Sequence, residues 1–136
     1  VPLVLLVLLA GVEVALRIPD REELVMRGNA ELLHRAVENV VRNALQHAGG
    51  SRRIEILLDA SPRQVLIRVR DQGEGVDEAD LEALFAPFAR GRASGGYGLG
   101  LAIARRAVAV HQGSIRAEKA PGGGVEVQIV LPLEPP

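Results

Sequence analysis

The sequence predicts an α+β domain in which helices cover one face of a mixed, mostly antiparallel sheet. Three observations lead to this prediction. Segments with the alternating polarity of strands lie on both sides of segments with helical periodicity. Strands and helices do not alternate regularly, as a doubly wound parallel sheet would require. The chain has 136 residues, which is the length of one domain with one core.

The first elements of the chain are predicted to be strands. In residues 12–18 apolar side chains alternate with polar or small ones, which is the period of a strand with one buried face. A Pro-Asp turn follows, and residues 24–26 (LVM) predict a short second strand that ends near Gly28.

The segment before these strands, residues 1–11, is almost wholly apolar. It is too short for a membrane span, which needs about 20 apolar residues. It also lacks the basic start and the cleavage site of a secretory signal. We expect it to be buried or to face a partner; the alternatives are a truncated anchor or an engineered terminus.

A long helix is predicted after Asn29, which is a favourable N-cap residue. Apolar residues then recur at spacings of four, three and four: Leu33, Val37, Val40 and Ala44. Residues 48–50 (AGG) supply glycine for the end of this helix.

Residues 54–58 and 65–69 alternate in polarity and are predicted to pair as antiparallel strands. Residues 77–84 predict a short acidic helix, and residues 85–98 show no periodicity.

The C-terminal part repeats the pattern of a helix followed by two strands. Residues 99–111 predict a helix closed by Gly113, and residues 114–118 and 125–131 predict the last two strands.

Composition restricts the partners of the chain. The 16 basic and 17 acidic residues give a net charge of −1, so no long-range field would gather nucleic acid or an anionic membrane. The chain has no cysteine, which excludes disulfides and thiolate metal sites. Aromatic residues make up 2% of the chain, so the core must be aliphatic.

Asn39 and Asn43 are four residues apart on the long predicted helix, so both project from one face at the margin of its apolar stripe. Amide oxygens are hard ligands suited to Mg²⁺ that is also bound by phosphate and water. The alternative is a pair of ordinary surface amides.

Asp71 directly follows a predicted strand, and Gly73 and Gly75 come shortly after it. A carboxylate at this position can accept a hydrogen bond from the exocyclic amine of adenine, while glycines let a flat ring approach the backbone. The alternative is an ordinary Asp-x-Gly turn.

A glycine-rich loop, residues 95–100 (GGYGLG), leads directly into the second predicted helix. Free backbone N–H groups and the helix dipole would meet there and favour a phosphate. The loop matches neither the Walker pattern nor the dinucleotide-binding fingerprint, because no Gly-Lys-Ser/Thr follows it and no strand precedes it.

Together these segments resemble the four boxes of the ATP-binding catalytic domain of bacterial sensor histidine kinases, in the order of that family. The N box is similar to residues 38–44 (ENVVRNA) and the first glycine box to residues 71–76 (DQGEGV). The F box is similar to residues 84–88 (LFAPF), and the second glycine box to residues 96–102 (GYGLGLA).

The resemblance implies a two-layer sandwich of the Bergerat type, shared with gyrase, heat-shock chaperone and mismatch-repair ATPases, and a site for ATP and Mg²⁺. It implies that Asn43 is the Mg²⁺ ligand, that Asp71 reads adenine and that Asn39 assists at the phosphates, with Glu38 as a candidate polariser of an incoming imidazole. The further residues implied to bind the nucleotide are Gln46, His47, Gly73, Gly75, Val76, Arg90, Gly96, Gly98, Leu99, Gly100 and Leu101.

The resemblance also implies partners. Histidine kinases phosphorylate a histidine on a separate helical hairpin and, through it, serve a response regulator. None of His34, His47 and His111 has the sequence context of that histidine. Residues 1–11 are then interpreted as a remnant of the connection to the phosphoacceptor domain and residues 12–136 as the catalytic domain. We expect a cytoplasmic domain, monomeric as a fragment, of a membrane-bound homodimer of the inner membrane.

Two alternatives stay open at this stage. One is a stand-alone serine kinase of the same superfamily. The other is a nucleotide-responsive binding module that has lost phosphoryl transfer. Gln46, which stands where the family commonly has a basic residue, and a short segment between Phe88 and Gly95 favour this second alternative.

Overall fold

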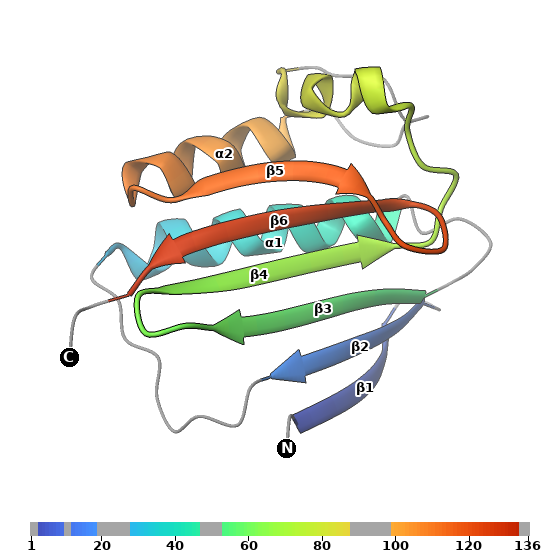
Figure 1. The fold of residues 1–136 in the computed structure, drawn as a ribbon, viewed down its shortest axis with the longest axis horizontal. Helices are drawn as coiled ribbons and strands as arrows, with labels where there is room; N and C mark the ends of the chain where they lie inside the picture. The colour runs from blue at the N-terminus through green and yellow to red at the C-terminus, as the bar shows by residue number, and fades with distance from the viewer. Residues whose placement is uncertain (1–2, 10–11, 19–27, 47–52, 88–98, 134–136) are drawn as a thin grey trace.

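The fold is a two-layer α+β arrangement built on one sheet (Figure 1). The computed structural model describes residues 3–9, 12–18, 28–46, 53–87 and 99–133. Their strands form a sheet of order β1-β2-β3-β4-β6-β5. β2 and β3 run parallel, and all other neighbours are antiparallel. The strands are β1 (Leu3–Leu9), β2 (Val12–Ile18), β3 (Arg53–Ala60), β4 (Gln64–Asp71), β5 (Ser114–Lys119) and β6 (Val125–Pro132). The predicted fold class is therefore confirmed.

Two α-helices pack against each other and on one face of this sheet, behind the strands in Figure 1. They are α1 (Ala30–Gln46) and α2 (Gly100–Val110). Asn29 caps α1 as predicted, because its side-chain Oδ1 accepts a hydrogen bond from the backbone N–H of Leu32 at 3.1 Å. Within the residues that the structure describes, neither helix is both long enough and apolar enough to cross a membrane.

The core lies between the helices and the inner face of the sheet and is aliphatic, as the composition predicts. From α1 it receives Val40 and Ala44, with Leu33 and Val37 packed at its margin. The sheet contributes alternate residues of its strands: Ile54, Val65, Val69, Val125, Val127, Ile129 and Leu131. The helical and strand periods of the sequence thus bring two apolar surfaces into contact.

The acidic segment after β4 differs from its prediction. Instead of one short α-helix it forms two 3₁₀-helices, η2 (Glu78–Asp80) and η3 (Glu82–Phe85). Leu81, which lies between the two 3₁₀-helices, and Leu84 are buried and three residues apart. Three residues per turn place such a pair on one line, as the 3₁₀ geometry requires.

The apolar N-terminal segment contains a strand that its sequence did not predict. β1 pairs with β2 from Leu3 opposite Ile18 to Leu9 opposite Val12. A continuous apolar run has no alternation, so the periodicity gave no signal for a strand. The predicted strand at residues 24–26 lies outside the described residues.

The end of α2 differs in detail from the prediction that Gly113 closes the helix. The left-handed residue is Gln112, with φ of 62°. Its N–H donates to the carbonyl of Ala109, and the N–H of Gly113 donates to the carbonyl of Val108. This is a Schellman ending with glutamine at the position that glycine usually occupies. Gly113 is required for another reason: a Cβ there would lie 2.3 Å from the carbonyl oxygen of Val130.

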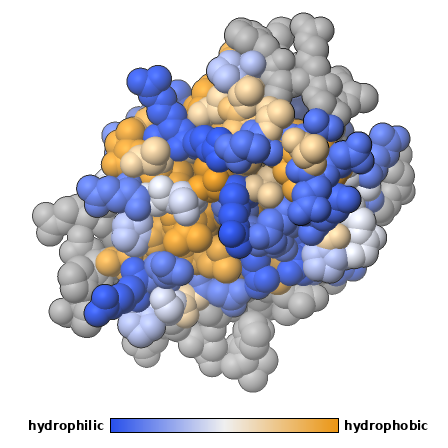
Figure 2. Space-filling view, turned by 45° about the horizontal axis from the view of Figure 1, so that its top comes forward, coloured by the Kyte–Doolittle hydropathy of each residue, from blue (hydrophilic) through white to orange (hydrophobic). Residues whose placement is uncertain are grey.

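The outer face of the sheet carries a polar network. Glu126 and Gln128 of β6 alternate with the core residues of that strand and are themselves buried. Glu126 pairs with Arg70 on β4, and Gln128 hydrogen-bonds both Glu126 and Glu118. Figure 2 shows hydrophilic and hydrophobic residues mixed on the face that it draws. The outer side of β4, β6 and β5 therefore carries paired polar groups, whereas their inner side meets the helices with apolar residues.

Candidate nucleotide site

The two asparagines of the N box lie on α1 one turn apart. Both are half-buried, and the buried Val40 and Ala44 follow them directly in sequence. The amides therefore lie where the core meets the surface, as their spacing predicts. Both side chains are thus carried by a helix and are neither fully buried nor fully exposed.

The start of α2 packs closely on Asn39. A Cβ placed on Gly100, the first residue of α2, would lie 3.7 Å from Cβ of Asn39 and 3.9 Å from its Cγ. Leu99 is the N-cap residue, and its carbonyl accepts from the N–H of Ile103 at 2.9 Å. The first turn of the helix, where unpaired N–H groups favour an anion, thus lies beside the N box.

The two predicted leucines of the second glycine box have different environments. Leu101 is 5% exposed and belongs to the core, whereas Leu99 is 37% exposed. Leu101 therefore fixes the start of α2 against the domain, and Leu99 lies at the surface. Of these two leucines, Leu99 is the one that is exposed enough to contact a ligand without displacing core residues.

Asp71, the last residue of β4, is buried on the inner face of the sheet with 2% of its surface exposed. Its Oδ1 accepts two backbone hydrogen bonds, from the N–H of Gly73 at 3.0 Å and from the N–H of Val125 at 3.2 Å. A buried carboxylate needs such partners, because burial without them is strongly unfavourable. The first glycine box therefore holds an oriented acid at the end of a central strand.

The glycines after Asp71 meet the turn between β5 and β6. Gly75 has φ of +80°, and its Cβ position is 3.5 Å from the carbonyl oxygen of Gly124. Val76 is half-buried against the core. A hollow of about 360 Å³ lies here, and Asp71 is not among the described residues that line it: Glu74, Gly75, Val76, Asp77, Lys119, Ala120, Gly123 and Gly124.

Figure 1 shows how these pieces are arranged relative to one another. The C-terminal end of α1, the start of α2, the C-terminal end of β4 and the turn between β5 and β6 all lie at the same end of the molecule. Asn43, Gly100 and Asp71 belong to these ends of α1, α2 and β4, and Asn39, nearer the middle of α1, lies beside Gly100.

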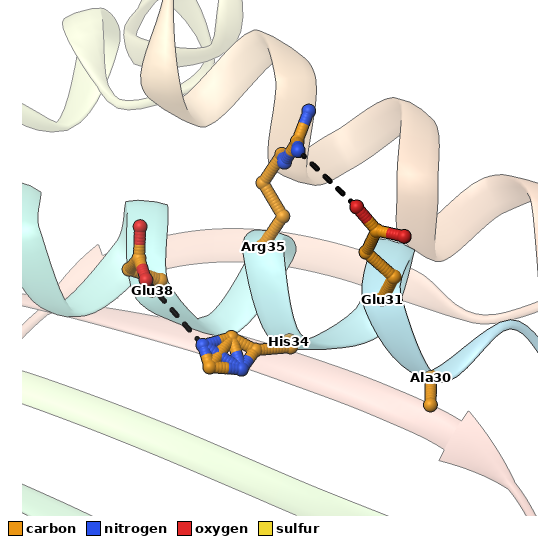
Figure 3. A pocket seen from close by; sticks show the side chains of 5 residues that line it. All are labelled: Ala30, Glu31, His34, Arg35 and Glu38. Atoms are coloured by element: carbon orange, nitrogen blue, oxygen red, sulfur yellow. Dashed lines mark hydrogen bonds and ion pairs between the residues drawn. The ribbon is translucent and has the colours of Figure 1, made fainter.

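Glu38 lies apart from this arrangement. Its carboxylate is on the exposed face of α1, 3.4 Å from Nε2 of His34 and 2.9 Å from a guanidinium nitrogen of Arg42. Figure 3 shows it with His34, Arg35, Glu31 and Ala30 along a hollow of about 460 Å³ on this face. The structure gives Glu38 helix-surface partners, so its catalytic role stays a prediction. The His34 side chain is exposed on the same face.

Some predicted residues are not placed beside the others. Gln46 is exposed at the last position of α1. His47, Arg90, Gly96 and Gly98 lie outside the described residues. Among the residues that are described, no group of three or more His, Asp or Glu is arranged to hold a metal ion.

The F box anchors the segment after β4 to α2. Phe85 is buried, and the guanidinium of Arg105 lies 4.1 Å from the centroid of its ring. Arg105 also pairs with Glu82 at 2.6 Å and donates to the carbonyl of Ile115 at 3.3 Å. The hydrogen bond from Arg105 holds the pKa of Glu82 below its usual range. The F box therefore has a structural role that is visible in its contacts.

Comparison with known proteins agrees with this geometry. Residues 28–135 match the model of the histidine kinase-, DNA gyrase B- and HSP90-like ATPase family. The chain belongs to this family.

Its relatives are sensor histidine kinases. The chain is 43% identical over 111 residues to the sensor histidine kinase CpxA of Escherichia coli, a match that covers 78% of this chain and 24% of CpxA. It is 37% identical over 125 residues to the probable sensor histidine kinase TcrY of Mycobacterium tuberculosis, with 88% and 26% covered. The chain thus spans about a quarter of the length of the curated relatives that it matches.

Solved structures give the same result. The mycobacterial sensor histidine kinase MprB superposes with a TM-score of 0.74 at 32% identity, covering 82% of this chain and 78% of that one. The ATP-binding domain of PrrB from Mycobacterium tuberculosis gives 0.69 at 28%, covering 94% and 83%. Full-length ShkA in complex with AMPPNP gives 0.65 at 26%, covering 77% and 22%. The chain is a catalytic ATP-binding domain of the sensor histidine kinase type.

Sequence reasoning missed one part of this kinase-type domain. Gly124 and the N–H of Val125 contact Asp71, although they lie more than fifty residues further along the chain. The signal was present as three consecutive glycines, residues 122–124, before the last strand. All three have positive φ, which glycine adopts readily.

Proposed function

We propose that the chain binds ATP with Mg²⁺ and transfers the terminal phosphate to a histidine supplied by another domain or another chain. The observation that carries the proposal is that half-buried Asn39 lies against the first turn of α2. The start of α2 and the C-terminal end of β4, which carries the buried Asp71, lie at the same end of the fold. Phosphate groups, metal and base would then be bound by three separate elements of one rigid domain.

The donor set fits Mg²⁺. This ion keeps several waters, binds phosphate oxygens and needs few protein ligands. Asn43 offers one amide oxygen from α1, and the described residues form no acidic cage that would favour a metal bound by the protein alone. When bound, Mg²⁺ would neutralise phosphate charge. The residues of this chain would position the nucleotide, which is the main contribution of a protein to phosphoryl transfer.

The roles of the remaining residues belong to the same proposal. Asp71 accepts a hydrogen bond from the adenine amine, and Gly73, Gly75 and Val76 shape the base pocket. Leu99 and Leu101 pack near that pocket, and Gly100 approaches the phosphates. Glu38 polarises the acceptor imidazole. The other residues proposed to bind the nucleotide are Gln46, His47, Arg90, Gly96 and Gly98.

We infer the partners from the relatives. The acceptor is a histidine on a helical hairpin, and a response regulator receives the phosphate from it. The full-length protein is then a membrane-bound homodimer whose catalytic domain lies in the cytoplasm, and the present chain alone is monomeric. Phosphoryl transfer requires the acceptor domain, so the chain alone is expected to bind ATP without phosphorylating itself.

Two measurements test this function. Titration of the chain with a fluorescent ATP analogue, with and without Mg²⁺, tests the site. Incubation with γ-labelled ATP and a separately produced histidine hairpin tests transfer, with the same hairpin carrying His→Gln at its acceptor as control. Label on the intact hairpin supports the kinase. Binding without label on any hairpin tested, including those of the sensor histidine kinases named above, supports the binding-module alternative instead.

A further inference from the structure

The carboxylate of Asp71 is held in one orientation by backbone donors from two distant parts of the chain. Gly73 donates its N–H from the loop after β4, and Val125 donates from the first residue of β6, both to Oδ1. A backbone N–H can only donate, so the two donors require an acceptor at the Oδ1 position and fix the plane of the carboxylate, with its other oxygen directed away from them.

Gly124 allows this close approach. Its φ is +84°, and a Cβ there would lie 2.2 Å from the carbonyl oxygen of Asp71 and 2.7 Å from its Oδ1. Real Cβ atoms do not come this close, and the first of these atoms is backbone that cannot rotate away. Any side chain at Gly124 must therefore push the turn and Asp71 apart.

Gly122, two residues earlier in the same turn, allows the effect of the backbone conformation to be distinguished from the effect of the contact with Asp71. It has nearly the same φ, +83°, and a Cβ there would meet nothing within 4 Å. Glycine at 122 therefore serves the backbone conformation alone, whereas glycine at 124 serves both the conformation and the contact with Asp71. The two positions form a matched pair for an experiment.

We propose that the Gly124–Val125 peptide, together with the N–H of Gly73, is a positioning element that sets base specificity by fixing the direction in which the carboxylate of Asp71 meets the nucleotide. With Oδ1 bound to the two N–H groups, the adenine amine is read by Oδ2. This inference rests on the proposed function, in which Asp71 contacts the base.

The same geometry determines what asparagine would do in place of Asp71. The two N–H donors require an oxygen at the Oδ1 position, so the amide nitrogen must take the place of Oδ2. That nitrogen donates, whereas the Oδ2 that it replaces accepts. Asp71→Asn therefore presents a donor to the base, which suits the 6-carbonyl of hypoxanthine and repels the 6-amine of adenine.

The test compares the affinities of the whole chain for ATP and ITP, both with Mg²⁺, and uses the ratio of the two dissociation constants. ITP keeps the triphosphate and changes only the base edge, where a carbonyl replaces the 6-amine and N1 carries a hydrogen, so loss of phosphate binding does not change the ratio. We expect the unmodified chain to prefer ATP by about tenfold or more, since a site built to pair a polar group discriminates strongly. Gly122→Ala should keep that preference, and Gly124→Ala should lose most of it.

Asp71→Asn provides a second, independent measurement of the same ratio. It remains informative if circular dichroism shows that Gly124→Ala does not fold. The Asp71→Asn variant should bind ITP more tightly than ATP, whereas Asp71→Ala should bind both about equally. Two results each overturn the inference alone: a folded Gly124→Ala with the same ratio as Gly122→Ala, or an Asp71→Asn ratio equal to that of Asp71→Ala. An unmodified chain that binds neither nucleotide overturns the proposed function, and the inference with it.

Discussion

The ring of His111, at the C-terminal end of α2, accepts a hydrogen bond at 2.8 Å on Nε2 from the backbone N–H of Asn29, 82 residues away. Its Nδ1 donates to the carbonyl of Ala107 at 2.7 Å. These partners assign a neutral ring with its proton on Nδ1. Since Asn29 caps α1, this buried histidine joins the end of one helix to the start of the other.

Removal of this link should destabilise the domain. His111→Ala leaves the Asn29 N–H without its partner and opens space between the helices, so we expect a loss of about 1–3 kcal/mol in the free energy of unfolding. Urea denaturation followed by circular dichroism measures it. His34→Ala is the control, because that ring is 72% exposed on α1, and it should change stability little. Equal effects of the two substitutions would contradict the role given to His111.

Substitutions at two adjacent residues at the end of α2 should change the stability of the domain in opposite directions. Gln112→Gly removes a side chain from a left-handed residue and should stabilise the domain by up to about 1 kcal/mol. Gly113→Ala should destabilise it by about 1–3 kcal/mol, because the new Cβ would lie 2.3 Å from the backbone oxygen of Val130. Thermal denaturation of both variants checks the signs. A stabilising Gly113→Ala would show that the helix end does not pack on β6 as described.

The acid stability of the domain should depend on Glu126. Burial acts to raise the pKa of this carboxyl, but hydrogen bonds from Arg70 and Gln128 and the charges of Arg70 and Arg68 outweigh it, so the pKa lies below its usual range. A pKa lowered by folding stabilises the protein above the unfolded value of about 4.3, and this contribution is lost as the pH falls through the folded value.

Glu126→Gln should therefore reduce the loss of stability between about pH 5 and pH 3, measured as the urea midpoint at each pH. The exposed Glu78 gives a control, and Glu78→Gln should leave the slope unchanged. A slope that is the same in Glu126→Gln and in the unmodified chain would refute this assignment.

The contact of Arg105 with the F box should be measurable at two sites. Arg105→Ala removes the guanidinium from the face of Phe85 and should cost about 1 kcal/mol of stability. It should also raise the pKa of Glu82, since the hydrogen bond from Arg105 is the main cause of its lowered value. NMR titration of the Glu82 carboxyl checks this. Arg106→Ala, at the exposed neighbouring position, should do neither.

Local sequence predicted the elements whose pattern is strong. The stripe from Leu33 to Ala44 and the Asn29 cap predict α1 and its first residue, whereas its predicted glycine end, residues 48–50, lies outside the described residues. Helix spacing and strand ends also predict where the side chains of Asn39, Asn43 and Asp71 project, while their roles toward a nucleotide stay predictions. The order of the boxes then predicted the family that the comparisons show.

Other features depend on tertiary contacts that no local pattern contains. The partner of His111 is 82 residues away, and Gly124 meets Asp71 only because β4 and β6 are neighbours in the sheet. β1 was missed because a uniform apolar run has no period. Gln112 takes a left-handed conformation that its residue type disfavours, since the packing of Gly113 on β6 fixes the chain there.

The most direct test of the central claim is the affinity of the chain for ATP as a function of Mg²⁺ concentration, measured by calorimetry for the unmodified chain and for Asn43→Ala, with His34→Ala as the control on the same helix. The account predicts that Mg²⁺ strengthens ATP binding to the unmodified chain and to His34→Ala. It predicts that Asn43→Ala loses this gain and binds about tenfold or more weakly, a difference of about 1.4 kcal/mol. An Asn43→Ala variant that binds ATP with unchanged affinity and unchanged dependence on Mg²⁺ would contradict it.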